Sequence, residues 1–205
     1  MARQERSHIT RQRIVEAAAE VFARNGFAGT SLNDIGRASG MTKGALYFHF
    51  SAKEDMATAV QQQGGQRLRA LAGQLASREL PLIQALIDMT HVLLRWLDEE
   101  PTLRASFRLA RERGADDGPA GVYNGWLRLA VDLLARARTL GELHPGVRED
   151  SYTIIVVAIG VGLEGLACAG LPRARMTAAL TAMWESLLPA LVSDEFLGKL
   201  RAADP

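Results

Sequence analysis

The sequence predicts an all-α protein, with a three-helix domain at the N-terminus followed by a larger helical domain. Apolar residues recur at the spacing of one helix face along most of the chain, and capping residues and glycines mark where successive helices begin and end. Early in the chain, two short helical segments follow each other across a glycine-centred turn, which is the arrangement of a helix-turn-helix.

Local signals define each element in turn. Asn25-Gly26 ends the first helix with a left-handed glycine turn, and Thr30 or Ser31 caps the second helix, with Asp34 placed to complete a capping box. Thr42 is positioned to cap the third helix after the turn at 39–41. The predicted helices span residues 10–24, 31–38, 42–48, 51–75, 80–97, 101–113, 123–140, 151–169 and 177–191, with a loop at 114–121.

Two of these helices carry a clear apolar row that we expect to face a core. In the first helix the row consists of Ile14, Ala17, Ala18, Val21 and Phe22. In the helix at 123–140 it consists of Trp126, Leu127, Ala130, Val131 and Leu134.

Composition narrows the class of protein. Apolar residues make up 48% and charged residues 23% of the 205 residues, which is ordinary for a globular protein. The single cysteine, Cys168, excludes an internal disulfide, and the first residues lack the apolar stretch of a signal peptide. The longest apolar run, at 154–163, is about half of the ~20 residues that a membrane-crossing helix needs. We therefore expect a cytoplasmic protein with no membrane partner.

Charge is distributed unevenly along the chain. Residues 1–53 contain 8 Lys and Arg against 4 Asp and Glu, whereas the remainder contains 16 against 19. Such an asymmetry favours a polyanionic partner for the N-terminal part. We expect a helix-turn-helix DNA-binding domain at 1–53 and a second domain with a different task at 54–205.

The third helix is suited to reading DNA in the major groove, which admits one helix. With Leu46, Phe48 and Phe50 assigned to the core, the outward residues are Thr42, Lys43, Ala45, Tyr47 and His49. Lys43 is a donor for guanine, Ala45 offers a methyl contact to thymine, and Gly44 allows close backbone approach. Tyr47, His49 and Lys53 lie where phosphates would pass. The alternative is a three-helix unit that only packs against the rest of the chain.

The segments Thr30-Ser31, 41–50 and Lys53-Glu54 closely resemble the DNA-binding region of the tetracycline-repressor (TetR) family of bacterial regulators, over residues 9–56. The resemblance implies an all-helical homodimer whose larger C-terminal domain binds a small ligand and whose last two long helices form the dimer interface. It places the operator contacts at Thr42, Lys43, Gly44, Ala45, Tyr47, His49 and Lys53, with Arg6, Arg11 and Arg13 as outer phosphate contacts.

A narrower resemblance links the opening segment 1–4, the string 103–110, Trp126 and Met183-Trp184 to the γ-butyrolactone autoregulator receptors, which control antibiotic production and development. It implies that Trp126 packs on a small lactone-like or furan-like signal; the alternative is a core tryptophan. Leu163 stands where we expect a ligand-contacting threonine in those receptors, which favours a related or antibiotic-derived ligand over a plain butyrolactone. The polar candidates for the ligand site are Gln62, Gln63, Gln84, Thr90, Tyr123 and Asn124.

The helices at 151–169 and 177–191 are the most apolar segments, and we expect them to pair with their symmetry mates in a homodimer. Gly162, Gly165 and Trp184 are the residues expected at this interface. The whole is then a ligand-responsive transcriptional repressor, bound to a pseudo-palindromic operator in double-stranded DNA and released by a small apolar molecule. The alternative within the family is a regulator of an efflux or catabolic gene that answers to an unrelated apolar ligand.

Two patterns in the sequence resemble those of enzymes or metal sites but do not fit such a function. Residues 160–165 read G-x-G-x-x-G, with Glu185 downstream, which resembles the fingerprint of an NAD-binding oxidoreductase but lacks the surrounding strands. His91, with Asp88 and Asp98 nearby in the sequence, resembles a metal site, but only Asp88 and His91 share a helix face. Two ligands are too few for a zinc site, which needs three or four, and no Cys/His cluster accompanies them. We expect no catalytic residue, no metal and no cofactor.

Overall fold

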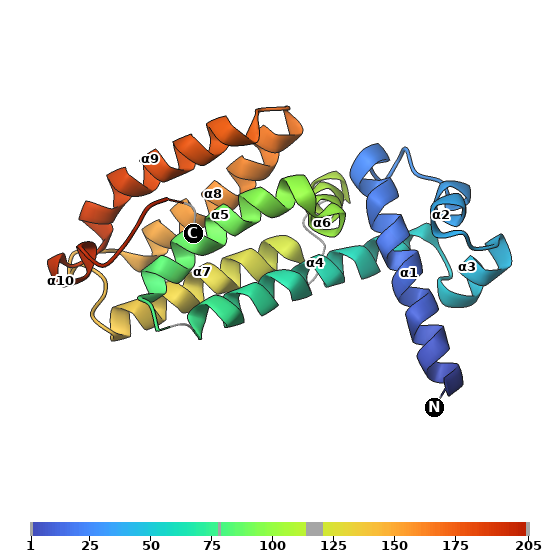
Figure 1. Ribbon diagram of the computed structural model, residues 1–205, viewed down its shortest axis with the longest axis horizontal. Helices are drawn as coiled ribbons and strands as arrows, with labels where there is room; N and C mark the ends of the chain where they lie inside the picture. The colour runs from blue at the N-terminus through green and yellow to red at the C-terminus, as the bar shows by residue number, and fades with distance from the viewer. Residues whose placement is uncertain (1, 78, 114–120, 204–205) are drawn as a thin grey trace. The chain divides into compact units, whose positions relative to one another are not determined.

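The computed structural model describes residues 2–77, 79–113 and 121–203, and these residues form helices joined by short connections, which confirms the all-α prediction (Figure 1). The single β-bridge described there joins Leu143 to Val192. The helices are α1 (Ala2–Asn25), α2 (Leu32–Ser39), α3 (Lys43–His49), α4 (Lys53–Ala76), α5 (Leu82–Glu99), α6 (Pro101–Arg113), α7 (Val122–Thr139), α8 (Glu149–Cys168), α9 (Arg173–Leu191) and α10 (Asp194–Leu197).

Three helices differ from the sequence prediction. α1 begins at Ala2, well before the predicted Thr10, because its polar first turns propagate the helix without needing a core to face. α9 begins directly after Pro172 and not at Thr177, because the carbonyl oxygen of Pro172, the N-cap, already accepts the first helical hydrogen bond, from the Met176 N–H at 3.2 Å. The single-turn helix α10 is too short to show a period. The predicted loop at 114–121 lies, apart from Gly121, outside the described residues.

The chain divides into two compact units that do not follow the order of the sequence. We call residues 1–67 and 100–124 the N-terminal unit, and residues 68–99 and 125–205 the C-terminal unit. The chain therefore passes between the units inside α4, between α5 and α6, and inside α7. Packing thus assigns α6 and the first half of α4 to the same unit as the helix-turn-helix, although the predicted domain boundary lies after Lys53. The division of roles between 1–53 and 54–205 stays a prediction.

The core of the N-terminal unit joins helices from both of its chain segments. The predicted row on α1 is buried in full, as are Ile35 of α2 and Leu46 of α3. Ala105 and Leu109 of α6 belong to the same cluster. The burial of α6 residues beside those of α1 and α3 makes α6 a structural part of the helix-turn-helix unit.

Phe48 was expected in this core and is instead 78% exposed. Leu46 and Phe50 are buried and lie four positions apart, so they share one side of the short helix. Phe48 is rotated by about 200° from Leu46 at ~100° per residue, which turns its ring to the opposite side.

In the C-terminal unit α5 is enclosed on all sides, with every residue from Leu82 to Leu94 buried, and it packs against α8 and α9. Its buried polar side chains are hydrogen-bonded inside the unit. Gln84 donates to Asp88 Oδ1 at 2.7 Å, and Thr90 Oγ1 accepts a hydrogen bond from Trp184 Nε1 at 2.9 Å. Trp184 is 0% exposed, so it forms part of the protomer's own core and does not face a partner, contrary to the expectation for it.

The predicted buried face of α7 is also partly wrong. Trp126, Ala130 and Leu134 are buried as expected, but Leu127 and Val131 are exposed. The buried row continues through Leu133 and Ala137 instead, because the core wraps a different side of the helix from the one that the densest apolar stretch suggested.

α8 and α9 lie side by side (Figure 1), and α8 exposes an unusually apolar surface. Ile154 is 69% exposed, and Val161 and Leu166 are also exposed. By length and composition alone, the segment Asp150–Cys168, with a mean hydropathy of 1.8, could cross a membrane. Only 28% of it is buried inside the protein, so most of this apolar segment is exposed. The run-length argument in the sequence missed this because Glu164 ends the apolar run, whereas a mean over the whole segment tolerates a single charged residue. Exposed apolar surfaces of this kind are typical of contact sites with another protein or with a membrane.

Candidate functional site

α2 and the turn that follows it are shaped by one cap and two glycines. Ser31 is the N-cap of α2, and its hydroxyl accepts the Asp34 N–H while the Asp34 carboxylate accepts the Ser31 N–H, as the capping box predicted. Gly40 ends α2 at φ 68°, a left-handed conformation that glycine adopts without strain. A Cβ at Gly36 would lie 3.2 Å from the Met41 carbonyl oxygen, so a glycine there lets the turn pass close to α2.

Asp34 is held in its charged form by this cap. The hydrogen bonds from the side chain and backbone of Ser31 lower the pKa of Asp34 below its ordinary value against the opposing effect of burial, and the nearby Arg37 lowers it further. The negative charge at the first turn of α2 also interacts favourably with the helix dipole.

α3 exposes most, but not all, of the residues that were predicted to face outward. Thr42 Oγ1 accepts the Ala45 N–H at 3.2 Å and so begins the helix. Lys43 and Gly44 are exposed, Tyr47 is 49% exposed, and Ala45 and His49 are half-buried. The Lys43 ammonium lies 5.9 Å from the centre of the Tyr47 ring, so the two side chains share one side of the helix. Phe48, which the sequence analysis assigned to the core, is also exposed on α3, and its ring lies edge-on to His49.

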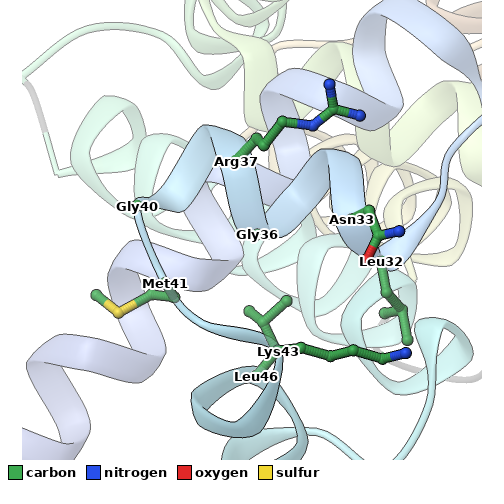
Figure 2. Close-up of a pocket in the computed structure, with 8 residues that line it drawn as sticks. All are labelled: Leu32, Asn33, Gly36, Arg37, Gly40, Met41, Lys43 and Leu46. Atoms are coloured by element: carbon green, nitrogen blue, oxygen red, sulfur yellow. The ribbon is translucent and has the colours of Figure 1, made fainter.

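A hollow of about 470 Å³ lies between α2 and α3 (Figure 2). The Lys43 side chain extends along it towards the start of α2, where Leu32 and Asn33 lie, while Arg37 points away from α3 (Figure 2). Asn33 and Arg37 are exposed polar residues that the sequence reasoning did not select. Their polarity on the outer face of a short amphipathic helix was the available signal.

Two other predicted DNA contacts are partly engaged inside the N-terminal unit. Lys53 Nζ donates hydrogen bonds to the carbonyl oxygens of Phe27 at 2.8 Å and Thr30 at 2.9 Å, which leaves one of its three donors for a phosphate. The Arg11 guanidinium stacks 4.8 Å from the centre of the Phe50 ring and so ties α1 to the end of α3. Arg6 and Arg13 are exposed on α1. Contacts of these residues with DNA remain predictions.

The predicted ligand-binding residues are divided between the two units. Trp126, Gln84 and Thr90 belong to the C-terminal unit, whereas Gln63 and Tyr123 belong to the N-terminal unit, as do Gln62 and Asn124. Within the N-terminal unit, Gln62 and Gln63 border a polar groove of about 190 Å³ between α1 and α4. The Tyr123 ring packs edge-on against Phe107. Gln84 also accepts the Arg201 N–H at 2.9 Å, so the C-terminal segment occupies part of its hydrogen-bonding capacity.

Trp126 is completely buried between α7 and α8. Its indole N–H donates to the Val156 carbonyl oxygen at 3.1 Å, and its ring lies against Gly160. Leu163, the residue in place of the expected threonine, is buried and borders a groove of about 310 Å³ between α8 and α9. Gly162 and Gly165 are exposed, and a Cβ at either position would meet no atom within 4 Å.

The alternative of a dinucleotide-binding oxidoreductase is excluded. Residues 160–165 lie in the interior of α8, whereas the fingerprint requires a strand, a glycine turn and the start of a helix. Among the residues that the structure describes, no three His, Cys, Asp or Glu side chains are grouped to hold a metal ion. His91 instead bonds through Nε2 to the Ala202 carbonyl oxygen at 2.8 Å.

Comparison with known proteins assigns the family. Residues 14–60 match the family of bacterial regulatory proteins called tetR. The A-factor receptor protein of Streptomyces griseus is 29% identical over 191 residues, which are 93% of this chain and 67% of that protein. The crystal structure of a γ-butyrolactone receptor (ArpA-like protein) superposes with a TM-score of 0.75 at 31% identity, covering 94% of this chain and 92% of that one.

A further solved structure is that of the TetR family protein CprB from Streptomyces coelicolor in complex with its operator sequence. It superposes with a TM-score of 0.73 at 32% identity and covers 94% of this chain and 93% of that one. These relatives are regulators of transcription and not enzymes. Similarity at this level over almost the whole of both chains of the superposed structures means that this protein belongs to the tetR family of bacterial transcriptional regulators, among which it resembles γ-butyrolactone receptors.

Proposed function

We propose that this regulator is a ligand-responsive repressor that controls antibiotic production from the cytoplasm. As a homodimer it binds a pseudo-palindromic operator, and a small butyrolactone-like or antibiotic-related molecule releases it. The observation that carries the proposal is the likeness to a γ-butyrolactone receptor over 94% of the chain, because the likeness includes the C-terminal unit as well as the helix-turn-helix.

The exposed face of α3 supports operator binding by direct readout. In this proposal Lys43 donates to guanine O6 and N7, the Ala45 methyl contacts thymine, and Tyr47 bonds a phosphate. The excess of basic residues in 1–53 adds a sequence-independent attraction that salt weakens. Two such helices in a dimer read successive major grooves when they lie about 34–36 Å apart, which gives the operator its two-fold symmetry.

The exposed apolar surface of α8 supports the homodimer. A second copy of α8 and α9 would cover Ile154, Val161 and Leu166, and the open positions Gly162 and Gly165 would let two helices approach closely. Burial against a second copy accounts for the apolar character of α8 without a membrane.

The surroundings of Trp126 support a mostly apolar ligand. A ligand seated against the ring would pack on its apolar face and take the indole N–H from Val156. Release of DNA then requires only that the ligand prefers a conformation in which the spacing of the two recognition helices is unsuited to the operator. α4 runs from one unit into the other, which makes it the continuous element through which such a preference would act.

The test is release of an operator duplex, selected by the wild-type protein from a random pool, by a panel of butyrolactones, butenolides, furans and antibiotics. We expect an effector from these classes to release wild-type protein and to need at least about tenfold higher concentration with Trp126→Phe, the loss expected for one hydrogen bond. Trp96→Phe, which changes a tryptophan that lies outside the proposed site, is the matched control. Release only by unrelated apolar compounds would support the efflux or catabolic alternative. An equal response of wild type and Trp126→Phe would show that Trp126 is core alone.

A further inference from the structure

α6 is packed into the helix-turn-helix unit by more than apolar contact. The Ser106 hydroxyl donates to the Val60 carbonyl oxygen of α4 at 2.9 Å, and any side chain at Gly64 would collide with Ser106. α6 therefore lies against the first half of α4 at a distance that tolerates no larger residue. From this position its last turns reach the end of α1.

Arg108 and Glu112 of α6 form hydrogen bonds with the backbone at the end of α1 and in the turn that follows it. The Arg108 guanidinium donates to the carbonyl oxygens of Ala23 at 3.0 Å and Arg24 at 2.9 Å, and through Nε to Glu112 at 2.8 Å. The other Glu112 oxygen accepts the Phe27 N–H at 2.6 Å. We call this pair and the backbone that it holds, residues 23–27, the α6 clasp.

The chemistry of the clasp matches the end of a helix. The last carbonyl groups of a helix have no partner within it and carry its partial negative charge, so a guanidinium is favoured there. Gly26 has φ 72°, and a Cβ at this position would lie 2.5 Å from Glu112 Oε1. The turn conformation and the close approach of the carboxylate thus both depend on a glycine at position 26.

The clasp continues directly into the helix-turn-helix. The Lys53 ammonium lies 4.3 Å and the Arg113 guanidinium 5.1 Å from the centre of the Phe27 ring, and the Phe27 carbonyl oxygen accepts a hydrogen bond from Lys53. Lys53 also binds the carbonyl of buried Thr30, and the next residue, Ser31, is the N-cap of α2. The segment from the end of α1 to the start of α2 is consequently held by α6 on one side and by the start of α4 on the other.

We propose that Arg108 and Glu112 are positioning residues for operator binding: they fix the turn from which α2 and α3 leave α1, and so set the direction of the recognition helix. The inference rests on the proposed operator binding and adds α6 to the elements that determine it. The two residues act through the backbone at 23–27, and no contact of their own with DNA is required.

Glu112→Gln in the full-length dimer gives a test with an unambiguous direction. The substitution makes the protein more positive, so long-range electrostatics alone would strengthen DNA binding. We expect instead an operator Kd raised about tenfold or more, as for the loss of a charge-assisted hydrogen bond. The slope of affinity against salt should stay unchanged because no phosphate contact is lost. Glu20→Gln, which makes the same change of charge at an exposed position on α1, should bind as tightly as wild type or slightly more tightly.

A second pair of variants separates positioning from simple destabilisation. Arg108→Lys retains a cation that can donate to the α1 carbonyls and should recover most of the affinity that Arg108→Met loses. Stoichiometric titration should show a full active fraction for every variant, with only the Kd changed. A reduced active fraction with an unchanged Kd, or a Glu112→Gln protein that binds like Glu20→Gln, would overturn the inference. Absence of operator binding by the wild type would instead overturn the proposed function together with the inference.

Discussion

A Cβ at Gly160 would lie 2.6 Å from the indole Nε1 of Trp126, so α8 passes Trp126 at a point where only glycine fits. The same indole donates to Val156 one turn earlier on α8, and this hydrogen bond fixes the ring. Of the three glycines that resemble a nucleotide-binding fingerprint, Gly160 therefore has a packing role, whereas Gly162 and Gly165 lie on the surface. The three glycines thus lie on two different faces of one helix and do not form one binding loop.

Gly160→Ala should destabilise the C-terminal unit. The added methyl group collides with a ring that its hydrogen bond holds in place, and overpacking of this kind costs about 1–3 kcal/mol. Gly73→Ala on α4, where a Cβ meets no atom, is the control and should stabilise by about 0.5–1 kcal/mol through helix propensity. Urea denaturation followed by tryptophan fluorescence measures both. Equal stability of the two variants would mean that the α7–α8 contact yields easily.

Lys43→Ala and Tyr47→Phe should weaken operator binding in different ways. Loss of the Lys43 ammonium removes a base contact, so we expect about 1–3 kcal/mol less binding to the operator and a relaxed base preference. Tyr47→Phe removes a hydroxyl proposed to bond a phosphate, so all sequences should be weakened alike. Gel-shift titrations on operator and scrambled duplexes distinguish the two patterns. Unchanged affinity of both variants would exclude this face of α3 as the reading face.

Gly165→Leu should dissociate the homodimer without unfolding the protomer. Its position is open in the single chain, so a leucine meets no internal obstacle, but it would project from the surface that the partner covers. Light scattering measures the mass, and circular dichroism checks that the helices persist. Gly73→Leu, at an open position on α4, should remain dimeric. A dimeric Gly165→Leu protein with normal DNA binding would place the interface elsewhere.

Glu142 should be a major contributor to the stability of the C-terminal unit. Its buried carboxylate accepts hydrogen bonds from the N–H groups of Leu82 at 2.8 Å and Ile83 at 2.9 Å. These N–H groups are at the start of α5 and have no acceptor within the helix itself. Glu142→Ala leaves both donors buried without an acceptor, at a cost of about 1–3 kcal/mol each. Glu142→Gln keeps one acceptor oxygen and should lose less. Thermal denaturation of the two variants beside Asp132→Asn, an exposed carboxylate paired with Arg136, gives the comparison.

Acid should weaken the N-terminal unit through Asp34 and Glu112. Partial burial raises the pKa of Glu112, but the hydrogen bonds from Arg108 and the Phe27 N–H, with the charges of Arg108 and Arg111, bring it below the ordinary value. A carboxyl group whose pKa is lower in the folded state than in the unfolded state stabilises the folded protein. The stabilisation is complete above the unfolded pKa, which is about 4 for both residues, and it is lost as the pH falls through the folded pKa.

The stability of the wild type should therefore decline more steeply below about pH 4.5 than that of the double variant Asp34→Asn/Glu112→Gln, which lacks both groups. Denaturant titrations between pH 3 and pH 6 measure the difference. Parallel curves for the two proteins would show that neither carboxyl group contributes to the acid response.

Features that depend on neighbouring residues were predictable from the sequence. The capping box of Ser31 and Asp34, the Thr42 cap and the end of α2 at Gly40 use hydrogen bonds and backbone conformations that span only a few residues. The apolar row on α1 is buried as its period indicated, because it is long enough to define one face. In short or nearly all-apolar helices the period leaves several faces possible, and Phe48, Leu127 and Val131 were assigned to the wrong ones.

The sequence by itself thus determined the helical class, the helix-turn-helix and the exposed face of α3, since local hydrogen bonding and helical period encode them. Only the tertiary structure decided how those helices are held. Glu112 and Phe27 lie 85 positions apart in the chain, and Trp184 and Thr90 lie 94 apart. No spacing in the sequence predicts such pairs, because each pair depends on where whole helices lie once the core has formed. The same reason places α6 with the helix-turn-helix and turns Trp184 into the protomer's core.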